Sequence, residues 1–272
     1  MKYFIDQDLL LKLAQENSQR YSQASPFPHI VLDNVFDDET LNEILNEFPS
    51  ANEIDWMKFS NPNERKLASR NETQFGDKTR QFIHYLNSKS FISFLEQLTG
   101  IENLIPDPSL EGGGLHQILP GGLLKIHADF NKHSKTSLDR RLNVLVYLNK
   151  NWNDEFGGHF ELWNKDMSKS EVRILPLFNR IAIFSTTSTS YHGHPDPLAC
   201  PNDRSRKSIA MYYYTNGRPA TEIVEGLHKH DTVFKNRKNQ NEIAEVNSIR
   251  LRDTLKKFVP PIFIEWKQKL LN

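Results

Sequence analysis

The sequence contains a single cysteine, Cys200, and no uninterrupted apolar run of the length that a membrane-spanning helix needs. One cysteine cannot form an internal disulfide, and it rules out a zinc site built from several thiolates. The chain also carries no net charge, because 34 basic side chains balance 34 acidic ones. Neither nucleic acid nor an anionic membrane is therefore expected as a partner.

The first residues lack the basic and then apolar regions of a secretory signal peptide, so we expect a cytoplasmic protein. With 272 residues, of which 38% are hydrophobic and 25% charged, the composition excludes a disordered or collagen-like chain. A chain of this length can bury one large core, and we expect a single domain over residues 1–272. The feature that stands out is the presence of ten histidines.

The N-terminal part, residues 1–110, is expected to be a mainly helical support for the rest of the chain. Asp37 can cap a helix that Pro49 ends. The apolar face of this helix is formed, at helical spacing, by Leu41, Ile44, Leu45 and Phe48. A short strand is predicted over residues 29–32, and a second helical stretch over residues 82–98.

The pattern changes in residues 111–217, where short β-rich runs alternate with turn signals such as Pro-Gly-Gly at 120–122. Those runs are Leu115–Leu119, Leu123–His127, Leu142–Leu148, His159–Trp163, Ile181–Phe184 and Ser208–Tyr214. Many short strands at this spacing favour an antiparallel jelly roll over a parallel α/β sheet. The predicted fold is therefore α+β with a mainly β core, a double-stranded β-helix (jelly roll) flanked by N- and C-terminal helices.

A C-terminal helical extension is expected over residues 218–272. Its apolar residues at approximate helical spacing are Ile243, Val246, Ile249 and Leu255.

His127 and Asp129 lie at the end of a predicted strand with one residue between them. Because residues i and i+2 of a strand project to the same face, the imidazole and the carboxylate converge there. Together with a histidine from another strand, they would make the two-histidine, one-carboxylate site that is typical of non-haem Fe(II) oxygenases. The sequence holds a second pair of this kind, His194 and Asp196, but it lies in a proline-rich loop. We therefore take His127 and Asp129 as ligands.

The third ligand is expected from residues 191–195, Tyr-His-Gly-His-Pro, which follow the predicted strand that ends at Phe184. His192 is the first choice because it is the first histidine of this segment. His194 stays open as the alternative.

Arg206 begins the run Arg-Lys-Ser that leads into the next predicted strand. Period two places Arg206 and Ser208 on one face, and the corresponding face of the earlier predicted strand, Leu142–Leu148, carries Tyr147. A guanidinium fixed there can hold a carboxylate through two parallel hydrogen bonds. Since a buried cation without a charged partner is costly, a bound dicarboxylate would stabilise it. Arg204, in the same loop, stays open as an alternative to Arg206.

The ordered set His-x-Asp, His and Arg-x-Ser resembles the Fe(II)/2-oxoglutarate-dependent oxygenases, specifically the prolyl 4-hydroxylase-type superfamily. The resemblance covers residues 112–214, with further similar runs at 147–152 (Tyr-Leu-Asn-Lys-Asn-Trp) and 157–162 (Gly-Gly-His-Phe-Glu-Leu). The entry Pro-Phe-Pro-His-Ile-Val at 26–31 and the helix after it are also similar to the lead-in of that group.

The resemblance implies a set of ligands and cosubstrates. The implied Fe(II) ligands are His127, Asp129 and His192. The implied contacts to 2-oxoglutarate are Arg206, to its distal carboxylate, with Tyr147, Ser208 and Gln117. O₂ would be the other cosubstrate, with ascorbate as a candidate reductant.

The implied reaction is the oxidative decarboxylation of 2-oxoglutarate to succinate and CO₂, coupled to hydroxylation of an unactivated C–H bond. Asp129 favours hydroxylation over halogenation, because related halogenases keep that position small. The implied substrate is amino-acid-like, prolyl or peptidyl or a small metabolite, and its pocket is expected to be shaped by residues 60–80 and 131–140. Two other functions stay open: a non-catalytic jelly-roll binding protein, and a zinc-dependent hydrolase that uses the same triad.

Overall fold

The computed structural model describes residues 4–238, and the residues up to Lys235 belong to one compact unit. Its helices are α1 (Gln7–Ser22), α2 (Asp38–Asn46), α3 (Asp77–Leu86) and α4 (Lys89–Thr99), with short 3-10 turns η1 (Glu72–Gln74), η2 (Asp154–Phe156) and η3 (Ala220–Glu222). Its first strands are β1 (His29–Asp33), β2 (Met57–Ser60), β3 (Glu64–Ala68), β4 (Ile105–Pro106), β5 (Gly114–Ile118) and β6 (Leu123–Ala128). The later strands are β7 (Asp139–Tyr147), β8 (Phe160–Trp163), β9 (Ser170–Ile174), β10 (Arg180–Ser185), β11 (His192–His194), β12 (Arg206–Thr215) and β13 (Val233–Phe234).

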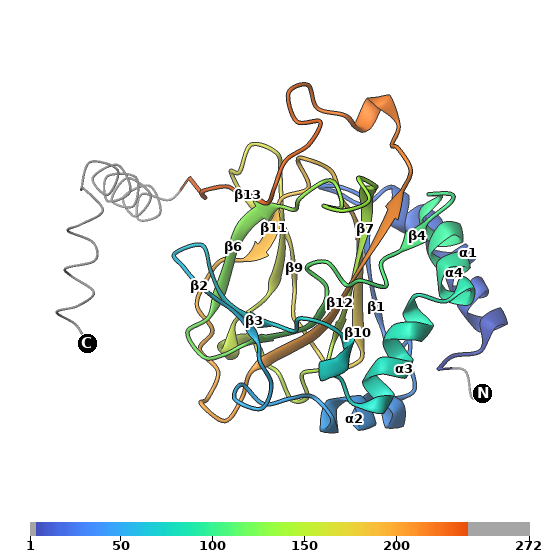
Figure 1. Cartoon of the computed structure of the whole chain (residues 1–272). Coiled ribbons are helices and arrows are strands. Elements are labelled where there is room, and N and C mark those ends of the chain that lie inside the picture. The colour runs from blue at the N-terminus through green and yellow to red at the C-terminus, as the bar shows by residue number, and fades with distance from the viewer. Residues whose placement is uncertain (1–3, 239–272) are drawn as a thin grey trace. The chain divides into compact units, whose positions relative to one another are not determined.

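The strands form an antiparallel sheet that curls into a barrel with two walls (Figure 1). The major wall has the strand order β1-β10-β7-β12-β5, and the minor wall has the order β6-β11-β8-β9. Strand β3 joins them, because it pairs with β5 on one side and with β6 on the other. This arrangement confirms the predicted jelly roll, in which the strands alternate between walls from β5 to β8 and again from β9 to β12.

Alternation along the major wall decides which residues face the barrel interior. On β12, Ile209 is buried in the large core that the wall shares with the helices, as are the alternate residues of β7 and β10. Ser208 lies opposite Tyr147 in the pairing of β12 with β7, and residues directly opposite one another share a face. The inner face therefore carries the polar residues Tyr147 and Ser208 together with apolar ones such as Phe184, while the alternate apolar residues point toward the helices.

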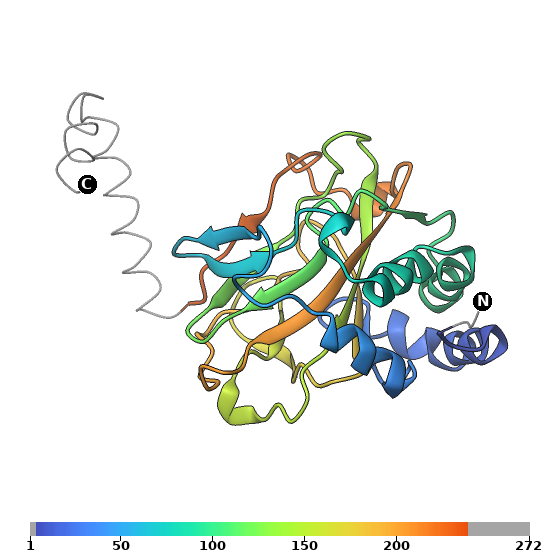
Figure 2. The same cartoon turned by 60° about the horizontal axis from the view of Figure 1, so that its bottom comes forward.

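The four helices lie along the outer face of the major wall, as two views of the molecule agree (Figures 1 and 2). Their aromatic and aliphatic side chains pack against β1, β7, β10 and β12. Burying each such side chain contributes about 1.5–3 kcal/mol relative to leaving it exposed. The helices thus stabilise the wall from outside and leave its inner face to line the barrel interior.

The helix predicted after Asp37 is confirmed, since the Asp37 carboxylate caps α2 by accepting a 2.9 Å hydrogen bond from the amide of Thr40. The stretch predicted over residues 82–98 is two helices rather than one. Its break comes where Asn87 ends α3 and Ser88 caps α4, with the amide of Phe91 donating to the Ser88 hydroxyl.

The region 60–80, which was expected to shape the substrate pocket, contains β3, η1 and the first residues of α3. Strands β2 and β3 form a hairpin, and β3 completes the barrel. In the other region expected to shape the pocket, residues 131–140, a bridge between Lys132 and Asp139 leads into β7.

Among residues 4–238, no helix is long and apolar enough to cross a membrane. The helix predicted around Ile243 to Leu255 lies outside the described residues.

Candidate active site

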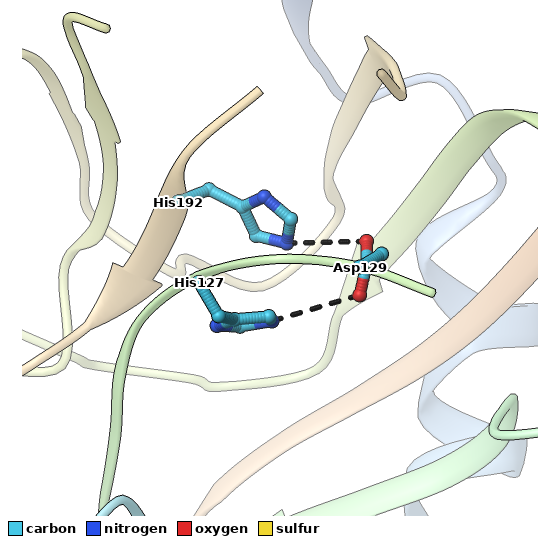
Figure 3. Close-up of side chains that lie close together, drawn as sticks. All are labelled: His127, Asp129 and His192. Carbon is cyan, nitrogen blue, oxygen red and sulfur yellow. Dashed lines mark ion pairs between the residues drawn. The ribbon is translucent and has the colours of Figure 1, made fainter. Parts of the chain in front are cut away.

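The predicted triad assembles on the inner face of the minor wall (Figure 3). His127 lies near the end of β6, Asp129 follows that strand, and His192 begins β11, where it pairs with His127. The Nε2 atom of His127 lies 3.6 Å from Oδ1 of Asp129, and Nε2 of His192 lies 3.3 Å from Oδ2. One donor atom from each residue falls within 4.8 Å of the others, which makes this a candidate metal centre.

Both imidazoles are oriented by the backbone. Nδ1 of His127 lies 2.8 Å from the carbonyl oxygen of Lys125, and Nδ1 of His192 lies 2.9 Å from that of Ser190. Because a carbonyl only accepts, each Nδ1 carries the proton and donates it, which leaves the Nε2 lone pair free. Figure 3 shows both free nitrogens turned toward the Asp129 carboxylate.

Asp129 is itself held by two residues of the major wall. The Asn143 amide donates a 2.8 Å hydrogen bond to Oδ2, and the guanidinium of Arg140 lies 3.1 Å from the same oxygen. Arg140 is buried, and its guanidinium carbon lies against two aromatic rings, 3.4 Å from the ring centre of Tyr212 and 4.4 Å from that of Phe130. This arrangement fixes one carboxylate oxygen in place.

The electrostatics of the triad favour the forms that bind a metal. Burial alone would raise the pKa of Asp129, but Arg140 and His192 outweigh it and lower the pKa well below its ordinary range. Burial and the neighbouring His192 ring lower the pKa of His127. The carboxylate is therefore charged and the His127 imidazole neutral near pH 7.

Arg206 projects into the same interior from the major wall. It is buried, its Nε donates a 2.9 Å hydrogen bond to the carbonyl of Gly158, and its terminal nitrogen Nη2 lies 3.4 Å from the Tyr147 hydroxyl. Burial lowers the pKa of this guanidinium, and Tyr147 opposes that shift. Among residues 4–238 no carboxylate pairs with it, so it can bind an anion.

Gly158 makes room for this arginine. It has a positive φ of 71°, and a Cβ there would lie 3.0 Å from Cδ of Arg206 and 2.6 Å from Cδ2 of Leu198. Only glycine fits at this point without displacing the side chain that donates to it.

The two alternatives from the sequence have different positions. His194 is not part of the cluster of donor atoms that His127, Asp129 and His192 form in the described part of the chain. Arg204 lies before β12, where its guanidinium donates 3.0 Å to the carbonyl of Lys150. The geometry thus favours His192 and Arg206 for the two predicted roles.

Gln117 lies on the other face of the wall from Arg206. It pairs with Lys207, whereas its neighbour His116 pairs with Ser208 and therefore faces the interior. The Gln117 amide donates 2.9 Å to Ser205. For this reason the site that we propose below does not include Gln117.

His116, Arg140 and Asn143 are the interior residues to which sequence reasoning gave no role. Period two from Tyr147 does place Asn143 on the inner face, so a signal existed for that residue. The sequence gives no such signal for Arg140, because this residue lies in a charged run that is typical of a surface loop. Enclosure in the barrel, with Lys66 adding its positive charge, lowers the pKa of His116 to about 3.

The comparisons with known proteins agree with this geometry. A family model described as the 2OG-Fe(II) oxygenase superfamily matches residues 113–214. A comparison with curated protein sequences gave no significant match.

Several solved structures share the fold. A prolyl hydroxylase from Trichoplax adhaerens, in complex with a hypoxia inducible factor peptide fragment, aligns with a TM-score of 0.54 at 19% identity, over 76% of this chain and 91% of its own. A prolyl-4-hydroxylase from Pseudomonas putida aligns with a TM-score of 0.56 at 13% identity, over 75% of this chain and 100% of its own. HygX from Streptomyces hygroscopicus, with nickel, 2-oxoglutarate and hygromycin B bound, gives 0.51 at 13% identity, over 80% of this chain and 97% of its own.

The family match spans the strands that carry the triad and Arg206, and the neighbours have the same barrel. Residues 113–214 therefore form a domain of the 2OG-Fe(II) oxygenase superfamily, similar in fold to prolyl hydroxylases, and the chain that carries it is a 2-oxoglutarate- and Fe(II)-dependent dioxygenase.

Proposed function

We propose that this dioxygenase hydroxylates an unactivated C–H bond of an amino-acid-like substrate, either a prolyl or peptidyl group or a small metabolite. The observation that carries the proposal is the position of two groups in one barrel. The triad of His127, Asp129 and His192 stands on the minor wall, while Arg206 enters the same interior from the major wall.

The triad fits Fe(II) in both chemistry and spacing. Two neutral imidazoles and one carboxylate are the donor set of non-haem Fe(II) oxygenases. Two ligands at right angles, each about 2.1 Å from a metal ion, lie about 3 Å apart. The separations of 3.6 and 3.3 Å from the histidine nitrogens to the Asp129 oxygens are close to that value. With three protein ligands, open positions remain for a cosubstrate.

Fe(II) with bound 2-oxoglutarate would supply the activation of O₂, with succinate and CO₂ as products and one oxygen atom transferred to the substrate. The protein residues would act by binding and orientation. Arg206 would pair with the distal carboxylate of 2-oxoglutarate, with Tyr147 and Ser208 beside it. Arg140 and Asn143 would keep the Asp129 carboxylate in its orientation throughout. The barrel walls would keep bulk water from the site.

The proposed substrate class follows the neighbours in fold. One of them was solved with a peptide fragment bound and another with hygromycin B. A peptidyl group and a small metabolite are therefore the two kinds of substrate to test first.

The test is a screen for succinate release by the purified chain with Fe(II), 2-oxoglutarate and ascorbate, against amino acids, prolyl peptides and metabolites. A true substrate should gain 16 Da, the mass of one oxygen atom. Asp129→Ala should abolish both signals, because the metal then loses its only carboxylate ligand. Full turnover in that variant would contradict the assignment of Asp129.

Two measurements, dependence on 2-oxoglutarate and uptake of iron, separate the two other functions that the sequence left open. A zinc-dependent hydrolase would turn over its substrate without 2-oxoglutarate. A non-catalytic binding protein would take up no iron on anaerobic reconstitution. Either result would overturn the proposal.

A further inference from the structure

His194 has a buried imidazole that bonds to nothing in the described part of the chain. The residue is 2% exposed, and neither Nδ1 nor Nε2 has a hydrogen-bond partner among residues 4–238. Buried polar groups are almost always hydrogen-bonded, since leaving one unsatisfied costs about 1–3 kcal/mol. By contrast, the ring of its neighbour His192 is fixed by the carbonyl of Ser190.

The position of His194 in the sheet directs it into the barrel. It lies two residues after His192 on β11, and alternate residues of a strand share a face. The register shifts between them, since His192 lies opposite His127 and His194 opposite Leu124, but the extra residue of this bulge belongs to β6 and leaves the alternation of β11 intact. Gly193, between the two histidines, faces the opposite side of the strand, where a Cβ would lie 2.7 Å from the carbonyl oxygen of Leu124. His192 points to the triad, so His194 points into the same interior one step further along the strand.

That step leads toward Arg206. Gly193 pairs with Glu161 of β8, so the antiparallel register continues from His194 toward the start of β8. Gly158, just before β8, accepts the hydrogen bond from Nε of Arg206. The imidazole and the guanidinium therefore belong to one pocket.

We propose that His194 donates a hydrogen bond to the distal carboxylate of 2-oxoglutarate, the carboxylate that Arg206 would hold. The inference rests on the proposed function and names a further binding residue for its cosubstrate. A carboxylate accepts several hydrogen bonds at once, so one ligand group can satisfy the guanidinium, the Tyr147 hydroxyl and the imidazole.

This contact would make the pocket selective. A ligand that binds the metal but lacks a distal carboxylate would leave both His194 and Arg206 without a partner. Sites built to hydrogen-bond a ligand group reject analogues without that group strongly, because buried polar atoms are then left unpaired. His194 would therefore add to the preference for a dicarboxylate such as 2-oxoglutarate over a shorter acid.

The test measures ligand binding in the full chain with Mn(II) in place of iron, by calorimetry in the absence of turnover. Two ligands are compared: 2-oxoglutarate, and oxalate as a metal-binding acid with no distal carboxylate. His194→Phe keeps a planar ring but removes the donor, and His194→Gln keeps a donor. The affinity for Mn(II) alone is measured for each variant.

We expect His194→Phe to weaken 2-oxoglutarate binding at least about tenfold, the effect of losing one hydrogen bond to a charged group. Its affinities for oxalate and Mn(II) should stay within about twofold of the wild type. His194→Gln should recover part of the loss. An unchanged affinity for 2-oxoglutarate, an equal loss for oxalate, or a loss of Mn(II) binding would each overturn the inference.

A second measurement does not depend on any variant folding. In wild-type protein with ¹⁵N-labelled histidine and Zn(II) bound, adding 2-oxoglutarate should shift a ring nitrogen of His194, while adding oxalate should not. Equal shifts with both ligands, or none, would overturn the inference. If the wild type binds Mn(II) but no 2-oxoglutarate, the proposed function itself fails, and that result is distinct from the others.

Discussion

Asn143 donates a hydrogen bond of 2.8 Å from Nδ2 to Oδ2 of Asp129, and its own Oδ1 accepts one of 2.9 Å from Nε of Arg140. The amide is therefore fixed at both ends, and it fixes the carboxylate of the triad in turn. Partners of this kind orient a metal ligand before the metal arrives.

Replacing Asn143 should weaken the metal site without removing a ligand. For Asn143→Ala we expect a loss of Mn(II) affinity of about 10- to 100-fold, the usual effect of deleting a partner of a metal ligand. Titration of the metal by calorimetry measures it. Asn202→Ala, at an exposed asparagine, is the control and should bind Mn(II) like the wild type. Unchanged affinity in Asn143→Ala would mean that Arg140 alone holds the carboxylate.

Arginine and lysine should not be interchangeable at position 206. In Arg206→Lys the planar fork is lost, so we expect the KM for 2-oxoglutarate to rise at least about tenfold. Arg204→Lys is the matched control, because Arg204 donates to the carbonyl of Lys150. Its KM should stay within about twofold of the wild type. The reverse pattern would transfer the proposed role to Arg204.

Gly158 should be intolerant of a side chain for two separable reasons. Gly158→Ala places a Cβ against Leu198 and Arg206 at a positive φ, whereas Gly121 has a similar φ of 76° and open space around it. We expect each alanine to cost about 1–3 kcal/mol of unfolding free energy from backbone strain, measured by urea denaturation. Only Gly158→Ala should also raise the KM for 2-oxoglutarate. An equal effect of both variants on KM would refute the steric argument.

His116 should make the fold less stable as the pH falls. Its pKa is lowered to about 3 in the folded chain, whereas a histidine in the unfolded chain titrates near 6.5. Between these values the unfolded state binds one more proton, so the free energy of unfolding decreases with decreasing pH.

From pH 6.5 to pH 5 this residue should account for about 2 kcal/mol of lost stability. His116→Gln should therefore show a shallower pH profile than the wild type when metal-free protein is unfolded in urea at each pH. Parallel profiles would show that the ring takes up a proton in the folded state as readily as in the unfolded one.

The triad could be predicted from the sequence because period two in a strand is enough to bring His127 and Asp129 together. The choice between His192 and His194 could not be made in the same way, since both lie on the same face of β11. What separates them is the position along the strand relative to Asp129, and this depends on how β11 pairs with β6.

Register also explains the difference at Gln117. A shift of one residue moves a side chain to the opposite face of a sheet, and the sequence pattern does not fix which of two adjacent polar residues points inward. The buried position of Arg140 could not be predicted from the sequence for another reason. Its neighbours Asp139 and Arg141 are charged, and only the folded chain shows that Tyr212 and Asp129 surround it.

The triad and Arg206 stand on different walls of the barrel, and β3 is the strand that joins those walls in the sheet order. Side chains already link the walls through space, as Asn143 does to Asp129. A ligand that touches the triad at one end and Arg206 at the other adds a further link of this kind, between β11 and β12. Its binding free energy then adds to the free energy of unfolding of the whole barrel. The backbone amides of these two strands, far apart in the sequence, should for this reason gain protection from hydrogen exchange together when the cosubstrate binds.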